Sequence, residues 1–162
     1  GAATACIRIH QSLLSSPSSV NSKVLFSYKR LLSSQSGLIH NSSFYNIKSQ
    51  FYAYIDQLIS RLQHDALNPL IHSPSFFSSV DVSKINCQQY DLFHLHWTQG
   101  GCLSIFDIPK LNKPIIWTLH DCWPFLGSEH CPSSLNDIRL TSCFKEPCTD
   151  ANNNLSAVIN ID

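Results

Sequence analysis

The sequence predicts an α/β fold built around a parallel sheet, and three observations support that prediction. Two bulky apolar runs, at residues 92–97 and 114–119, lack the polar alternation that is typical of half-exposed strands. The glycine pair at 100–101 stops the first run. The apolar pattern over 102–111 predicts a helix before the second run begins. A strand, a glycine break, a helix and another strand make one βαβ unit, in which the two strands are parallel.

Hydrophobic spacing predicts the elements that precede this unit. Apolar residues at i, i+4, i+7 and i+11 place one face on a helix over 2–14, which the Ser/Pro-rich stretch 15–21 ends. Residues 23–28 are typical of a short strand, and the Ser-rich stretch 29–43 of a loop. A second helix is expected over 44–64, with an apolar stripe facing the core; its members are Phe44, Ile47, Phe51, Ile55, Leu58 and Leu62.

Three shorter segments leave alternatives open. Asn68-Pro69 breaks the second helix, and residues 70–77 suit either a strand or a loop because Pro74 interrupts them. A short helical turn is expected over 81–87, with Ser79 or Asp81 as its cap. Residues 155–161 could begin a further strand.

Composition limits the possible functions of the chain. A length of 162 residues fits one domain, and 43% hydrophobic residues suffice for a real core. Lys and Arg together number 11, as do Asp and Glu, so charge gives no reason to expect binding of nucleic acid or an anionic membrane. We find no apolar run long enough to span a bilayer, so at most peripheral membrane contact is expected.

Seven cysteines are present, and four of them fall within residues 122–148. Since no secretion signal is evident, free thiols in a reducing, cytoplasmic compartment are the default expectation. With His130, the four clustered cysteines leave open a small zinc-binding module at 122–148. Their spacing is irregular and contains no C-x-x-C pair, so we expect no metal. A triad of Cys122, His120 and Asp121 is not expected either, because adjacent residues rarely converge.

The predicted sheet brings two His- and Trp-containing segments together. Ligands of parallel sheets bind beyond the carboxyl ends of the strands. That position is taken by residues 96–101 after one strand and residues 120–125 after the next. Histidine beside aromatic rings is typical of a sugar or nucleotide pocket, although buried His and Trp also serve as core.

The stretch from Asp91 to Cys131, DLFHLHWTQGGCLSIFDIPKLNKPIIWTLHDCWPFLGSEHC, resembles the N-terminal domain of family-4 glycosyltransferases of bacterial polysaccharide synthesis. It carries the family's H-L-H-W strand and the G-G that follows, then K-P, W-T-L-H-D, W-P-F and E-H. The start of the chain, GAATA, also looks like the glycine turn and first helix of that domain. From residue 15 to residue 78 the likeness is only architectural.

The resemblance implies a Rossmann-like acceptor-binding domain over 1–162, the N-terminal half of a GT-B fold that is cut at both ends. The partners it implies are a nucleotide-sugar donor and a glycan or lipid-linked acceptor, in cell-surface polysaccharide biosynthesis. It implies no metal and no cofactor besides the nucleotide-sugar co-substrate, and a cytoplasmic site of action that could lie at the inner face of the membrane. The donor-binding half is absent, so we expect no transfer by this chain alone.

His120 and Asp121 are the catalytic candidates. By resemblance, His120 matches the active-site histidine of the family, and its imidazole could bond a sugar hydroxyl. Asp121 could orient His120, accept a hydrogen bond from a sugar hydroxyl, or cap the following turn. Gly1 resembles the last glycine of the diphosphate loop, at the start of a helix that favours an anion.

The remaining candidates are assigned to substrate binding. His96 and Trp97 end the first strand, where His94 lies on the same face as His96 and is expected to pack beneath the site. Gly100 and Gly101 either admit a ligand to the backbone or make a plain turn. Trp123 stacks on a sugar or anchors its loop in the core. Glu129 and His130 match the family's E-H segment, where Glu129 could bind acceptor hydroxyls or be a plain surface carboxylate.

Two alternatives to the enzyme remain. The chain could be an inactive truncated remnant, or a glycan-binding module without catalysis.

Overall fold

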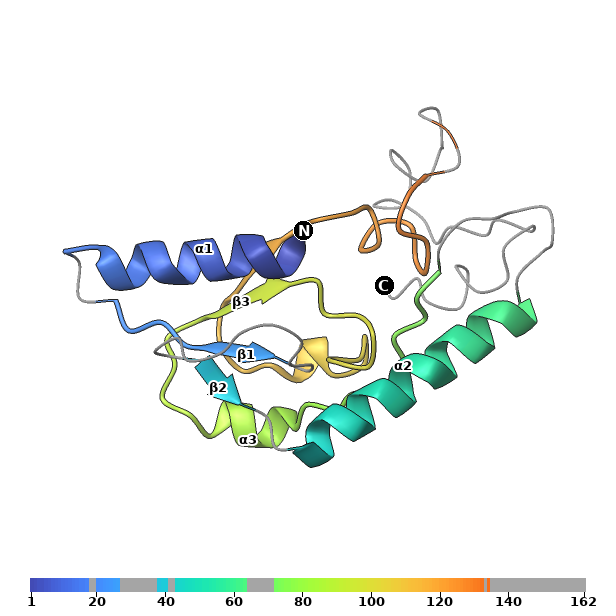
Figure 1. Ribbon diagram of the computed structural model, residues 1–162, viewed down its shortest axis with the longest axis horizontal. Helices are drawn as coiled ribbons and strands as arrows, with labels where there is room; N and C mark the ends of the chain where they lie inside the picture. Colours follow the sequence, from blue (N-terminus) through green and yellow to red (C-terminus); the bar gives the residue numbers. More distant parts are fainter. Residues whose placement is uncertain (18–19, 27–37, 41–42, 64–71, 133, 135–162) are drawn as a thin grey trace.

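The computed structural model describes residues 1–17, 20–26, 38–40, 43–63, 72–132 and 134 (Figure 1). This part of the chain combines helices with short parallel strands. The elements are, in order, α1 (Ala2–Ser15), β1 (Val24–Phe26), β2 (Leu38–His40), α2 (Ser43–Gln63), α3 (Val82–Asn86), β3 (Phe93–His96), the 3-10 helix η1 (Ile108–Lys110) and β4 (Ile115–Thr118).

The described strands form two parallel pairs. β1 pairs with β2, and β3 pairs with β4 in the register Phe93↔Ile115 to His96↔Thr118. The second pair confirms the parallel strands predicted on either side of the glycine break. The two pairs are separate sheets within the described residues. The structure therefore shows a mixed α/β architecture with small two-stranded parallel sheets.

α1 confirms the helix that was predicted over 2–14. It contacts β1 and β3, and Figure 1 shows it running opposite to the direction in which those strands point. Its start at Gly1 therefore lies on the side toward which β3 runs. His10, buried near the end of the helix, places its Nδ1 2.9 Å from the Ser22 hydroxyl just before β1.

Two predictions about local structure were wrong. Residues 38–40 were assigned to a loop but form β2, because their backbone pairs in parallel with the predicted strand β1, a contact distant from any local pattern. The helix expected over 102–111 is replaced by turns and by η1. Backbone N–H groups at 103, 104 and 105 bond to Thr98 O, Ser78 Oγ and Ser75 O, which holds this stretch against other loop segments.

α2 was predicted in the right place but with the wrong face inward. Of the stripe assigned to the core, the exposed members are Ile47, Phe51, Leu58 and Leu62, and the side chain of Phe44 lies outside the described residues. The buried positions are polar: Ser49, Asp56 and Ser60. The reason is tertiary, because the polar face meets the segments 72–80 and 98–105, whose backbone groups need hydrogen-bond partners.

Around the predicted site, the chain is mostly irregular but well bonded. Residues 73–78 form neither strand nor helix, and His72 makes an isolated bridge to Glu129. Asp81, rather than Ser79, caps α3 by accepting from Lys84 N at 3.3 Å.

Ile105 and Trp123 form the buried centre of a hydrophobic cluster, and Ile59, Phe76 and Trp117 pack against it. The predicted break at Asn68-Pro69 and the possible strand at 155–161 lie outside the described residues.

Candidate functional site

Two histidines meet at the carboxyl edge of the β3–β4 pair. His96 ends β3, and His120 comes two residues after β4. Because the strands are parallel and His96 is in register with Thr118, their ends lie side by side. His96 Nδ1 lies 3.0 Å from His120 Nε2, within hydrogen-bond distance. The structure thus brings together two residues that the sequence assigned to one pocket.

His94 lies behind this pair, on the same face of β3. Its ring centroid is 4.3 Å from that of His96, and its Nε2 lies 2.7 Å from the Thr118 hydroxyl. Burial and the neighbouring rings of His94 and His120 lower the pKa of His96 to about 4. Burial also lowers the pKa of His94. His96 is therefore neutral near pH 7, with one ring nitrogen as donor and the other as acceptor.

Trp97 provides an aromatic surface beside the histidines. Its side chain is 46% exposed, and its backbone has a positive φ of 35°. That conformation is uncommon for a non-glycine residue, and it directs the chain out of β3 into the glycine turn. The ring centroid lies 6.4 Å from that of His130. An exposed indole next to polar imidazoles can stack on a sugar ring while the imidazoles bond its hydroxyls.

Gly100 and Gly101 turn the chain after β3, with φ angles of 67° and 72°. A Cβ at Gly101 would lie 2.5 Å from Ser49 O and 2.9 Å from Tyr52 Cβ, both on α2. Gly101 is thus needed because α2 approaches the turn closely. A plain turn, one of the two roles considered for this glycine pair, accounts for the glycine at both positions.

Gly1 precedes α1 and is exposed. Its carbonyl accepts from Ala5 N at 3.1 Å, which is the first bond of the helix. A Cβ at this position would meet nothing within 4 Å, so no packing contact explains the glycine.

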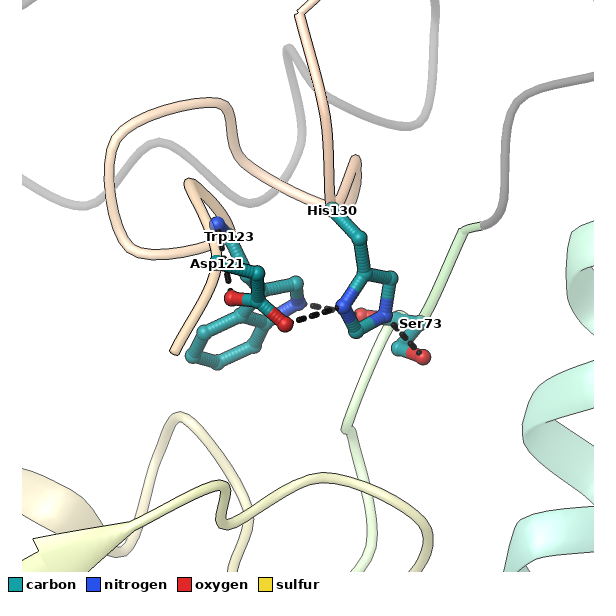
Figure 2. Close-up of polar contacts among 4 residues, drawn as sticks. All are labelled: Ser73, Asp121, Trp123 and His130. Carbon is teal, nitrogen blue, oxygen red and sulfur yellow. Dashed lines mark hydrogen bonds and ion pairs between the residues drawn. The ribbon is translucent and has the colours of Figure 1, made fainter. Parts of the chain in front are cut away.

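Asp121, His130 and Ser73 form a second polar cluster, shown in Figure 2. Asp121 Oδ2 lies 2.6 Å from His130 Nδ1, and His130 Nε2 lies 2.8 Å from Ser73 Oγ. Asp121 Oδ1 accepts from Trp123 N at 3.1 Å, which is the turn-capping role among the three considered for it. The two oxygens of Asp121 bond Trp123 N and His130 Nδ1 rather than His120, whose Nε2 bonds His96.

Trp123 and Glu129 are both buried, which agrees with the second of the two roles considered for Trp123 and corrects the expectation for Glu129. Trp123 is 3% exposed and donates from Nε1 to Ser73 O at 2.7 Å, so it anchors its loop and offers no face to a sugar. Glu129 is 1% exposed, so it is neither a surface carboxylate nor accessible to acceptor hydroxyls in this conformation. Both side chains are buried because the 121–130 turn, to which they belong, folds back onto residues 72–73.

Sequence reasoning missed Ser73. It lies 57 residues from His130 in an irregular segment, so no periodicity or local motif connects the two. Pro74 beside it marks a break in regular structure but does not indicate a partner.

The described residues contain no group of three or more His, Cys, Asp or Glu side chains placed to hold a metal ion. Cys122 and Cys131 are free thiols, and Cys143 and Cys148 lie outside the described part of the chain. The alternative zinc module at 122–148 therefore stays a prediction that the described residues do not test. No described helix is both long enough and apolar enough to cross a membrane.

No protein-family model, curated protein or solved structure matches this chain.

Proposed function

We propose that this chain is the acceptor-side, Rossmann-like part of a GT-B glycosyltransferase of family 4. The enzyme would transfer a sugar from a nucleotide-sugar donor to a glycan or lipid-linked acceptor in polysaccharide biosynthesis. One observation carries the proposal: His96 and His120, both within the stretch that resembles the family, come within 3.0 Å of each other at the carboxyl edge of parallel strands. Ligands of parallel sheets bind at that edge.

The chemistry of the pair suits a polyhydroxylated ligand. His96, with a pKa of about 4, stays neutral and can both donate and accept. His120 is exposed, so its imidazole can reach a hydroxyl of a bound sugar. The exposed Trp97 ring offers a face for the C–H groups of the same sugar. In this proposal His120 is the catalytic residue and His96 positions it; Asp121 supports the loop that carries His120.

Tryptophan fluorescence tests the binding half of the proposal. Trp97 is exposed, Trp117 is partly buried and Trp123 is buried, so acrylamide quenching mainly reports Trp97. Oligosaccharides of the acceptor type are expected to protect it from quenching, and Trp97→Phe should remove the protected signal. His120→Ala should weaken binding while leaving far-UV circular dichroism unchanged. If no saccharide in a broad panel changes the quenching, the proposal is wrong.

A transfer assay separates catalysis from glycan binding. In the complete product of the gene, His120→Ala is expected to lower kcat/KM for sugar transfer by more than about threefold, as expected if it loses a contact to the transition state. A smaller effect with intact glycan binding would favour the alternative of a binding module without catalysis.

A further inference from the structure

The cluster of Ser73, His130 and Asp121 has a geometry that the proposed sugar site does not use (Figure 2). Asp121 and His130 come from one turn and Ser73 from a segment 57 residues before His130, and both ring nitrogens of His130 are engaged. The 2.8 Å distance to the hydroxyl is typical of a hydrogen bond, and the 2.6 Å distance to the carboxylate is slightly shorter than is usual for a nitrogen donor. The inference below stands independently of the proposed function.

The partners of His130 determine the direction of each hydrogen bond. An ionised carboxylate can only accept, so the proton of a neutral imidazole lies on Nδ1 and is donated to Asp121. Nε2 then carries the lone pair and accepts from the Ser73 hydroxyl. A serine bonded to an imidazole that a carboxylate orients is the arrangement that activates serine nucleophiles.

Ser73 is held firmly while remaining accessible. Its N–H donates to Ser128 O at 2.8 Å, and its carbonyl accepts from Trp123 Nε1 at 2.7 Å. These two bonds fix the backbone from which the hydroxyl projects. Ser73 is half-buried, and the side chains of His130 and Asp121 keep 11% and 17% exposure. The cluster is therefore mostly buried, with Ser73 and Asp121 partly exposed, so a small reagent is the suitable probe.

We propose that Ser73 is a nucleophile that accepts an acyl group from an activated ester. Ser73 Oγ attacks the acyl carbon as its proton passes to His130 Nε2, and a new C–O bond forms. The bond from the acyl carbon to the leaving oxygen breaks, and His130 returns the proton to the departing alcohol. The products are acyl-Ser73 and the free alcohol, with Asp121 holding the imidazole in the required tautomer.

Pro74 limits what this nucleophile can do. In hydrolases with a nucleophile elbow, the N–H of the residue after the nucleophile stabilises the oxyanion. Proline has no N–H, so that donor is missing directly after Ser73. We therefore expect one acylation per chain, followed by slow release, rather than rapid turnover.

Labelling with 4-nitrophenyl acetate tests the proposal on the purified chain. A stoichiometric burst of nitrophenol is expected, with the acetyl group located at Ser73 by peptide mass spectrometry. Ser73→Ala should abolish the burst. His130→Gln and Asp121→Asn should slow it by about 100-fold, the usual effect of losing a general base.

Ser22 supplies the matched control, because its hydroxyl also lies within 2.9 Å of a histidine nitrogen, on His10. Ser22→Ala should leave the burst unchanged. Acetylation spread evenly over several serines, or a burst that survives Ser73→Ala, would overturn the proposal. The mass spectrum of the labelled chain without substitutions shows which serine is acetylated even if a variant fails to fold.

Discussion

Three imidazoles lie close together near the carboxyl edge of β3 and β4. The pKa of His96 is lowered because its burial disfavours charge and because the rings of His94 and His120 flank it. Its folded-state pKa lies near 4, below the 6.5 that is ordinary for histidine. The unfolded chain therefore takes up this proton at a higher pH than the folded chain does.

The stability of the fold should consequently depend on His96 in acid. Its contribution is complete above pH 6.5 and is lost progressively as the pH falls toward about 4, because only the unfolded state is protonated in that window. Urea unfolding between these two pH values should show a shallower loss in His96→Gln than in the unmodified chain. NMR titration of the ring protons of His96 checks the cause directly. A midpoint near 6.5 would contradict it.

At the scale of single residues, the site was partly predictable from the sequence. The placement of His96 beside His120 followed from two parallel strands whose carboxyl ends must meet. The burial of Trp123 and Glu129 was not predictable, because it depends on how the 121–130 turn folds back onto residues 72–73. No local pattern encodes such a contact.

At the scale of elements, α2 shows what periodicity can and cannot predict. Its bounds followed from the spacing of apolar residues, which agrees with the structure to within one residue. Its orientation did not, because the close approach of the turn at Gly101 and the need of the Ser75 amide for an acceptor place Ser49 and Asp56 inward. Hydrogen-bond requirements of irregular backbone thus prevailed over the apolar stripe.

The contact between α2 and the glycine turn gives a matched pair of variants. Gly101→Ala places a methyl group 2.5 Å from a backbone oxygen of α2 and also strains a φ of 72°, so it should lower the free energy of unfolding by about 3 kcal/mol or more. Gly100→Ala has a similar φ but meets only the Trp97 ring at 3.5 Å, so it should cost about 1–2 kcal/mol. Urea unfolding compares the two. Equal losses would mean that the close approach of α2 is wrong.

At the scale of the whole molecule, a chain of hydrogen bonds that starts at one buried carboxylate joins three segments far apart in sequence. Asp56 of α2 accepts from Ser75 N at 3.1 Å. Ser75 has a positive φ of 56° and is fully buried, and its carbonyl accepts from Ile105 N at 3.0 Å. Burial raises the pKa of Asp56, against the lowering effect of backbone bonds from Phe76 and Ser75. Asp56 thus links α2 through residue 75 to the turn that follows β3.

Removing this link should loosen the packing around it. Asp56→Ala leaves the buried Ser75 amide without its acceptor and is expected to cost about 2–4 kcal/mol of unfolding free energy. Asp56→Asn keeps an oxygen for that amide and relieves the burial of a charge, so it should cost about 1 kcal/mol or less. Amide hydrogen exchange locates the effect: Ser75 and Ile105 should lose protection in the Ala variant and keep it in the Asn variant. If both variants lose stability equally, the charge of Asp56 rather than its hydrogen bond stabilises the fold, and the link through Ser75 is not what joins these segments.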